Sequence, residues 1–296
     1  KYVYVGIKGL PPGQLMPDGS PIKYRVQYSK VDDCRAVTDI KHPAVRAALQ
    51  YYRIDTPLEF HVFGDLPGRS GLGGSSAFAV GLLNALHHHL NIPQTDSLLD
   101  LAREAVAFER HGIQEAVGIQ DQIQCAWGGI NVIRINQSGN YMVEPIPMDN
   151  GSQKIIEDHF LLVFTGLQRY ASEIAKVQID NISRNESELL RIKDLVDIAM
   201  EAIKAMDIER VGNLLHETWM LKRGLTNLIS TDALDKIYNT ARKNGAWGGK
   251  VLGAGGGGFF LFAAPPERHQ YIIDALGLIS IPVRFEHLGS QVVHVG

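Results

Sequence analysis

Residues 65–86 read Asp65-Leu-Pro-Gly-Arg-Ser-Gly-Leu-Gly-Gly-Ser-Ser-Ala-Phe-Ala-Val-Gly-Leu-Leu-Asn-Ala-Leu86. Five glycines fall between Gly64 and Gly74, two serines follow, and small and apolar residues without proline complete the stretch. Such a run favours a helix. We therefore predict the end of a strand, a glycine-rich loop and the N-terminus of a buried helix.

A loop of this kind can bind an anion. Glycines let the backbone approach a phosphate at positive φ, so that successive N–H groups point at one ligand, and the helix dipole adds positive charge. Ser75 and Ser76 add hydroxyls for a phosphate or a metal ion. No lysine follows the glycines, so this is not a Walker loop. The alternative is a tight turn that packs a small-residue helix on a sheet.

Composition excludes several classes of protein. The chain has 296 residues, of which 45% are hydrophobic and 21% charged, which is typical of a globular protein of one large or two medium domains. A formal net charge of -3 argues against a nucleic-acid surface. Two cysteines predict no disulfide scaffold. No apolar run reaches membrane-spanning length and no signal peptide is visible, so we expect a cytoplasmic protein.

Two carboxylates stand out in the first half. A helix predicted up to Arg110 carries Glu109 near its C-terminal end, where the dipole disfavours a carboxylate unless a cation compensates. Asp121 lies among apolar and amide residues, where burial would require a cation or hydroxyl partner. A carboxylate so placed can accept the proton of a hydroxyl that attacks a phosphate. The alternative for Asp121 is a helix cap.

Three consecutive histidines follow the loop helix at residues 87–89. They invite interpretation as a metal site. Consecutive helical residues point about 100° apart, so three in a row cannot face one ion. We interpret them as surface histidines.

Further elements follow from periodicity and composition. Before the loop we expect strands near 1–7, 24–28 and 57–63 and a helix over 42–52; after it, strands over 130–135, 160–164 and 283–286 and helices over 185–205, 207–223, 231–244 and 267–276. Arg169 follows the 160–164 strand, where its guanidinium group can bind a phosphate through two hydrogen bonds. The alternative is that Arg169 is a solvated helix residue.

A second glycine cluster lies near the C-terminus. It reads Gly248-Gly-Lys-Val-Leu-Gly253-Ala-Gly-Gly-Gly-Gly258 and runs into the apolar strand Phe259-Phe-Leu-Phe262. Four consecutive glycines before a strand indicate a backbone that another group must approach closely.

These segments resemble the GHMP small-molecule kinases. Pro67-x-x-x-Gly71-Leu-Gly-x-Ser75-Ser is similar to the second motif of that family, and the cluster at 248–258 to its third. Gly118-Ile-Gln-Asp-Gln122 is similar to the galactokinase segment around its catalytic aspartate. Family members usually have Ser where this chain has Gly74, which leaves Ser75 in place of the magnesium-associated serine.

The resemblance implies an α+β fold. An N-terminal ribosomal-protein-S5-like domain with a left-handed βαβ unit would occupy residues 1–153, and a ferredoxin-like C-terminal domain residues 154–296, with the active site between them. The first motif of the family, a strand and a substrate loop, would lie upstream of Lys1.

The same resemblance implies ATP and Mg²⁺ as cofactors and a role for particular residues. Nucleotide contacts would come from Pro67, Gly68, Gly71, Leu72, Gly73, Gly74, Ser75, Ser76, Gly255 and Gly256. Ser75 and Glu109 would hold the metal and Asp121 would act as base. Substrate contacts would come from Gln122, Arg169, Lys222, Gly256 and Gly257.

Within the family the sequence is most similar to the branch that phosphorylates a heptose 7-phosphate. The pieces that carry this similarity are Tyr28-Ser-Lys30, His42-Pro-Ala-Val-Arg46, Gln120-Asp-Gln122, Phe164-Thr-Gly166, Ala171-Ser-Glu-Ile174 and Trp219 with Lys222-Arg223. The expected partner is a small-molecule sugar phosphate, with no nucleic acid and no membrane; a homodimer stays open. The alternatives are a fucokinase-like sugar 1-kinase and a non-catalytic sugar or nucleotide sensor.

Overall fold

A computed structural model describes residues 1–66, 68, 70–92, 97–167 and 171–295. The chain forms two compact units. The first contains Lys1–Gly68, Gly73–Gly128 and Leu288–Gly296, and the second contains Arg69–Leu72 and Gly129–His287. The main division thus follows Gly128, earlier than the boundary expected after residue 153. The glycine-rich loop passes from one unit to the other between Leu72 and Gly73.

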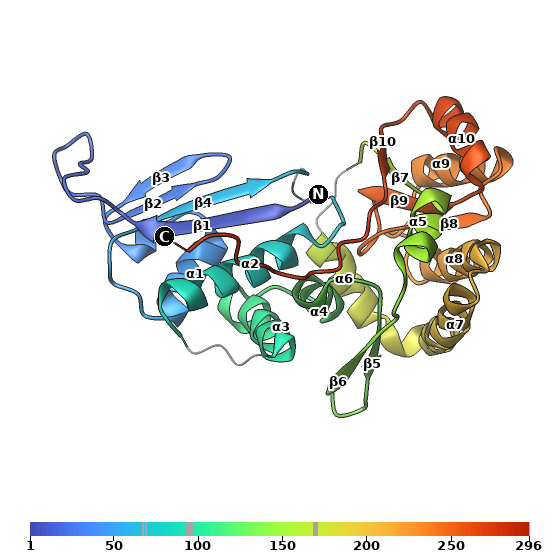
Figure 1. The fold of residues 1–296 in the computed structure, drawn as a ribbon, viewed down its shortest axis with the longest axis horizontal. Helices are drawn as coiled ribbons and strands as arrows, with labels where there is room; N and C mark the ends of the chain where they lie inside the picture. Colours follow the sequence, from blue (N-terminus) through green and yellow to red (C-terminus); the bar gives the residue numbers. More distant parts are fainter. Residues whose placement is uncertain (67, 69, 93–96, 168–170, 296) are drawn as a thin grey trace. The chain divides into compact units, whose positions relative to one another are not determined.

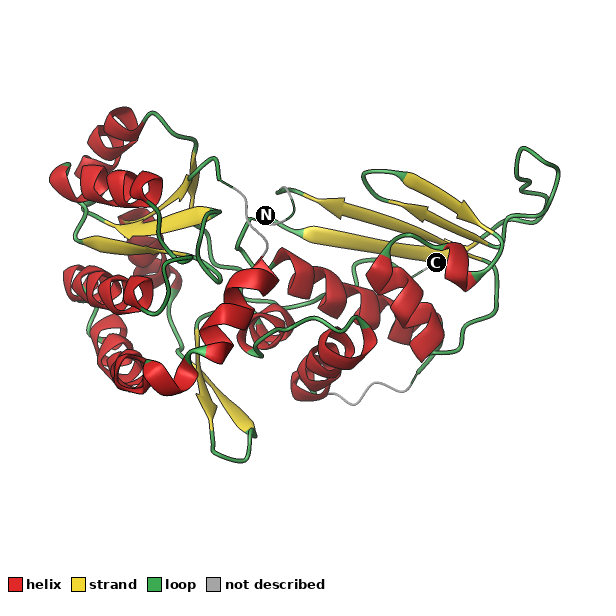
Figure 2. Cartoon of the chain, turned by 180° about the vertical axis from the view of Figure 1, so that it is seen from behind, coloured by secondary structure: helices red, strands yellow, loops and turns green. Residues whose placement is uncertain are grey.

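The first unit is built on a four-stranded sheet, whose strand order is β1-β4-β2-β3. The strands are β1 (Val3–Gly9), β2 (Tyr24–Gln27), β3 (Val31–Cys34) and β4 (Leu58–Gly64). β2 and β4 are parallel, whereas the other pairs are antiparallel. Parallel neighbours need a crossover connection, and here it contains η1 (Val37–Asp39) and α1 (Pro43–Tyr51). Figures 1 and 2 show the helices of this unit on one face of the sheet.

The predicted loop helix is α2, Gly74–His89. Most of its apolar residues are buried, and Gly81 faces Val5 of β1, where a Cβ would make an ordinary contact at 3.5 Å. The helix predicted over 98–110 is α3 (Leu98–Ala107) followed by a π-helical turn, η2 (Phe108–Gly112). α4 (Gln120–Trp127) completes the helical layer. Within the described ranges, no helix is long and apolar enough to cross a bilayer.

The C-terminal segment belongs to the first unit. Asn84 of α2 donates a hydrogen bond from Nδ2 to Ser290 Oγ at 3.0 Å. Gly289 lies directly on the end of α4, where a Cβ would come within 1.9 Å of the Ala126 carbonyl oxygen. The last residues therefore pack on the helices that carry Ser76 and Asp121.

The second unit contains a four-stranded antiparallel sheet with the order β10-β7-β9-β8 and a separate hairpin. The strands are β5 (Asn131–Ile135), β6 (Tyr141–Pro145), β7 (Phe160–Phe164), β8 (Gly248–Val251), β9 (Phe259–Ala263) and β10 (Ser280–Pro282). Side chains alternate across β9: Phe260 and Phe262 enter one buried cluster, and Leu261 and Ala263 the other.

Helices cover both faces of this sheet (Figures 1 and 2). They are α5 (Asn150–His159), α6 (Ala171–Asp180), η3 (Ile182–Arg184), α7 (Glu186–Lys204), α8 (Ile208–Gly224), α9 (Asp232–Lys243), η4 (Pro266–Arg268) and α10 (His269–Leu276). One buried cluster includes side chains of α9 and α10, and the other includes side chains of α5 and α7.

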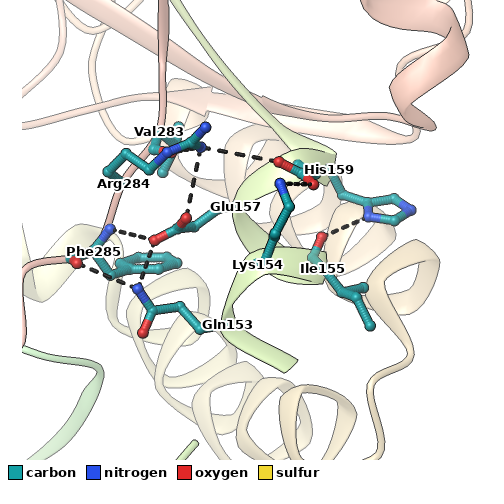
Figure 3. A network of polar contacts seen from close by, with 9 residues as sticks. Gln153, Lys154, Ile155, Glu157, His159, Val283, Arg284 and Phe285 are labelled. Atoms are coloured by element: carbon teal, nitrogen blue, oxygen red, sulfur yellow. Dashed lines mark hydrogen bonds and ion pairs between the residues drawn. The ribbon is translucent and has the colours of Figure 1, made fainter. Parts of the chain in front are cut away.

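The strand expected over residues 283–286 is wrong: β10 ends at Pro282. Figure 3 shows the cause, because Glu157 of α5 turns toward this segment. The backbone N–H of Phe285 donates to Glu157 Oε1 at 2.8 Å instead of to a neighbouring strand. Gln153 donates to the same oxygen at 2.7 Å, and Arg284 forms an ion pair with Oε2 at 3.6 Å. α5 itself was not expected from the sequence.

Candidate functional site

The N-terminus of α2 is open. Gly73 is its N-cap residue with φ +69°, in the left-handed region that glycine adopts without strain. Gly74 and Ser75, in the first turn, are exposed. First-turn N–H groups have no acceptor within their own helix, and the positive end of the dipole lies there. This turn can therefore hold an anion such as a phosphate.

A buried polar cluster lies just inside that turn. Ser76 Oγ donates to Glu109 Oε2 at 2.9 Å, and Gln122 Nε2 donates to the same carboxylate. All three side chains are buried: Ser76 is 3% exposed, and Glu109 and Gln122 are each 1% exposed. They come from three elements, α2, η2 and α4, so the packing of the first unit builds the cluster. A π-helical turn at Glu109 is typical of functional positions.

Burial raises the pKa of the Glu109 carboxyl, and the hydrogen bonds from Gln122 and Ser76 offset this only in part. Among the described residues, no basic side chain forms an ion pair with Glu109. The cation that the sequence suggested for this carboxylate is therefore not supplied by a described residue. The Oε1 atom of Gln122 is also buried without a hydrogen-bond partner in the described ranges.

The oxygen atoms of Ser76, Glu109 and Gln122 are suitable ligands for a magnesium ion. Carboxylate, hydroxyl and amide oxygens are hard ligands, and Mg²⁺ is commonly held by one or two carboxylates together with phosphates of the substrate and water. The described residues contain no group of three or more His, Cys, Asp or Glu side chains that could hold a metal by themselves. A single buried carboxylate beside an anion-binding turn agrees with an ion that takes its other ligands from the substrate.

Ser76, rather than Ser75, contacts Glu109. Ser75 is exposed, whereas Ser76 is buried against the carboxylate. Neighbouring helical residues point about 100° apart, so only one of the two serines can face Glu109. The structure thus pairs Ser76 with Glu109 and leaves Ser75 at the open turn, and the role of Ser75 as a metal ligand stays a prediction.

Asp121 is exposed, so the cost of burying this carboxylate, considered from the sequence, does not arise. It lies in the first turn of α4 beside the N-cap of α2, because a Cβ at Gly73 would lie 3.5 Å from its Oδ2 atom. The exposed carboxylate therefore adjoins the open first turn of α2. Its neighbour Gln122 is buried and donates to Glu109, and its expected substrate contact stays a prediction.

The glycine cluster of the second unit packs against other backbone. Its glycines 255–258 all have positive φ. The N–H groups of Gly256 and Gly258 donate to the Ile229 and Leu167 carbonyls, each at 2.8 Å. A Cβ at Gly257 would come within 2.6 Å of Leu167 O. The N–H of Gly256 is thus hydrogen-bonded within the fold, and the expected contacts of Gly256 with nucleotide and substrate stay predictions.

The remaining predicted residues differ in their surroundings. Lys222 Nζ donates to the Gly253 carbonyl oxygen at 2.5 Å, so the ammonium contacts the glycine cluster. Gly68 is exposed, with open space around it. Pro67 and Arg169 lie outside the described residues.

The histidine run is not a metal site in the described structure. His88 and His89 are exposed, whereas His87 Nε2 contacts Tyr52 Oη at 3.0 Å and Glu104 at 2.9 Å. Tyr52, His87, His88 and Glu104 line a cavity of about 540 Å³ at the far end of α2 from Ser76.

Sequence reasoning missed two structural roles. Gln122 serves as a donor to Glu109, and Thr165 bonds to the glycine cluster, as described below. Helical phase could have indicated Ser76, because it shares a buried face with Ala79 and Leu83, three and seven residues on. Nothing in the local sequence identifies Gln122 or Thr165.

Comparison with known proteins defines the class. The family "GHMP kinases N terminal domain" matches residues 40–129, and "GHMP kinases C terminal" matches residues 199–277. The two matches fall one in each unit and together cover more than half of the chain. The chain belongs to the GHMP kinase family, whose members are ATP-dependent kinases, and the α+β architecture expected from the sequence is confirmed.

Among particular relatives, the chain is 32% identical over 224 residues to the D-glycero-alpha-D-manno-heptose 7-phosphate kinase of Campylobacter jejuni, covering 74% of this chain and 66% of that protein. It is 29% identical over 251 residues to the bifunctional fucokinase/GDP-fucose pyrophosphorylase of Arabidopsis thaliana, covering 82% and 23%. The chain thus spans just under two thirds and about a quarter of these two relatives.

A crystal structure shares the fold. A D-glycero-D-manno-heptose 1-phosphate kinase from Bacteriodes thetaiotaomicron superposes with a TM-score of 0.75 at 22% identity, covering 97% of this chain and 85% of that one.

Proposed function

We propose that this chain transfers the γ-phosphate of ATP to the anomeric hydroxyl of D-glycero-D-manno-heptose 7-phosphate, giving the 1,7-bisphosphate. One observation carries the chemistry: the open first turn of α2 adjoins both the buried Ser76–Glu109 pair and the exposed Asp121. An anion site, a hard-cation site and a carboxylate base are the parts that phosphoryl transfer needs. The choice of sugar rests on the similarity to the heptose 7-phosphate kinase.

The residues have distinct tasks in this proposal. First-turn N–H groups of α2, at Gly74, Ser75 and Ser76, hold phosphate oxygens of the nucleotide. Ser76 and Glu109 hold Mg²⁺, and when bound this ion neutralises the charge that develops on the phosphates. Asp121 orients the sugar hydroxyl and accepts its proton as its oxygen attacks phosphorus. Because Asp121 is exposed, a substrate can reach it without rearrangement of the cluster.

A cytoplasmic location fits this proposal, since ATP is the donor. The 7-phosphate would be held by basic side chains, and Lys222 and Arg169 remain our candidates for it.

A second candidate function follows from Lys222. Its ammonium donates to the Gly253 carbonyl, which gives it a structural contact independent of any phosphate. A sugar 1-kinase that acts on an unphosphorylated sugar would need no cation there, and the fucokinase relative favours such an activity. Dependence on the 7-phosphate separates the two candidates.

The test is ADP release with Mg-ATP against heptose 7-phosphate, unphosphorylated heptose, fucose, galactose and mevalonate. We expect turnover with heptose 7-phosphate alone. Turnover with an unphosphorylated sugar would retain the kinase chemistry and contradict the proposed substrate. Nucleotide binding without turnover on any compound would favour a sensor.

A further inference from the structure

Thr165 directly follows β7 and is buried. Its N–H and its hydroxyl both donate to the carbonyl oxygen of Gly258, at 2.9 and 2.8 Å. The hydroxyl oxygen also accepts a hydrogen bond from the Leu167 N–H at 3.2 Å. In return the Gly258 N–H donates to the Leu167 carbonyl at 2.8 Å. The short segment 165–167 thus forms hydrogen bonds with both the carbonyl and the N–H of Gly258, the last glycine of the cluster.

Gly258 in turn touches the glycine-rich loop. A Cβ on Gly258 would lie 2.3 Å from the Ser70 carbonyl oxygen and 3.4 Å from the Gly71 nitrogen. Gly253, five residues earlier in the cluster, contacts the same loop, because a Cβ on it would lie 3.0 Å from the Gly71 carbonyl oxygen. Ser70 is buried and Gly71 has φ +77°. The backbone at Ser70 and Gly71, where the glycine-rich loop begins, is therefore positioned by contacts with Gly253 and Gly258.

We propose that Thr165 is a positioning residue for the phosphate-binding loop. It acts through Gly258 on Ser70 and Gly71, which precede the first turn of α2 by only a few residues. The Thr165 hydroxyl bonds to Gly258 and Leu167, and the contacts that lead from it through Gly258 to Ser70 and Gly71 lie within the second unit. The inference rests on the proposed function only in assigning the loop to nucleotide phosphates.

The hydroxyl of Thr165 forms hydrogen bonds that a side chain of the same shape without a hydroxyl cannot form. Thr165→Val keeps the volume and the N–H bond to Gly258, but it removes the acceptor of the Leu167 N–H and one donor to Gly258. Loss of one such hydrogen bond is worth about 1 kcal/mol, or roughly fivefold in an equilibrium constant. Thr165→Ser keeps both bonds.

The experiment measures Mg-ATP binding by calorimetry and steady-state kinetics for the whole chain, with unfolding as a check on the fold. We expect Thr165→Val to raise the Kd and the KM for ATP about fivefold, while kcat and the KM for the sugar change by less than twofold. Thr165→Ser should restore wild-type values. If Thr165→Val does not fold, Thr165→Ala against Thr165→Ser isolates the same hydroxyl.

The possible results distinguish a failure of the inference about Thr165 from a failure of the proposed function. ATP affinity unchanged in the hydroxyl-free variant would overturn the inference and leave the proposed function intact. Equal weakening in Thr165→Ser would also overturn it, because volume rather than the hydroxyl would then be responsible. A wild-type protein that binds no nucleotide would overturn both, whereas one that binds ATP but phosphorylates no sugar would overturn only the proposed function.

Discussion

Two glycine-rich segments of this chain look alike in sequence and use glycine for different reasons. At the start of α2, Gly74 is exposed, and a Cβ on it would meet no other atom within 4 Å. In the cluster at 253–258, by contrast, Gly255, Gly257 and Gly258 would each place a Cβ less than 3 Å from another part of the chain. The helix turn of the first segment is open to a ligand, whereas the second segment is filled by the protein itself. Gly71, earlier in the first segment, is also packed, because a Cβ there would lie 2.9 Å from the Leu252 carbonyl oxygen.

This difference limits what a glycine motif can indicate. A glycine whose N–H faces solvent at a helix N-terminus can bind phosphate, whereas one whose N–H is bonded to a carbonyl, as in Gly256, cannot donate it again. The assignment of Gly255, Gly256 and Gly257 to ligand contacts followed from the resemblance of their motif to the kinase family. In the structure Gly255 and Gly257 let the backbone approach Ile229 and Leu167 closely, and the Gly256 N–H donates to the Ile229 carbonyl. The ligand contacts of these glycines stay predictions.

The largest effect is expected at the open segment. Asp121→Asn keeps the size of the side chain but removes the base, so kcat should fall by about 10²–10⁴, with the KM for ATP little changed. ADP release measures both. Asp100→Asn, an exposed substitution on α3, is the control. A kcat within threefold of wild type would show that Asp121 takes no proton.

A pair of alanine substitutions tests the comparison itself. Gly258→Ala combines φ +87° with a clash at Ser70, and should destabilise the protein by at least about 1–3 kcal/mol. Gly74→Ala meets open space and should change stability by less than about 0.5 kcal/mol. Urea unfolding followed by circular dichroism gives both values. Equal stability of the two variants would contradict the distinction between an open and a filled glycine segment.

Glu109→Gln should separate stability from activity. Because burial raises the pKa of Glu109, the folded state retains this proton to a higher pH than the unfolded chain does. Stability from this group is therefore lost as pH rises above the ordinary pKa of glutamate. The neutral amide avoids that loss, so the variant without nucleotide should be more stable than wild type by about 1–3 kcal/mol at neutral pH, with less advantage at acidic pH, yet catalytically impaired.

Unfolding at neutral and mildly acidic pH measures this difference. A Gln variant less stable than wild type at neutral pH would mean that the Glu109 carboxylate stabilises the fold without a cation.

The smallest effect concerns Lys222. If its contact with Gly253 is its main task, Lys222→Met should lower kcat/KM for phosphorylated and unphosphorylated sugars by the same few-fold factor. Selective loss with heptose 7-phosphate, read from competition between the two sugars, would instead place Lys222 at the 7-phosphate.

Most elements could be predicted because their causes are local. The run 160–164 coincides with β7, and the proline at position 43 begins α1. The strand expected over 283–286 failed because Glu157, more than 120 residues earlier, takes the N–H of Phe285. For the site, Glu109 and Asp121 were found as unusual carboxylates, but their surroundings were not.

By itself the sequence determined that a glycine-rich turn opens a buried helix, that Glu109 and Asp121 follow at suggestive positions, and that the chain resembles a kinase family. These conclusions need only composition, periodicity, spacing and motif similarity. The tertiary structure alone decided that Ser76 faces Glu109, that Asp121 is exposed beside Gly73, and that the second glycine cluster packs on the first loop. Each of these depends on which surfaces of distant segments meet, and a one-dimensional pattern does not contain that information.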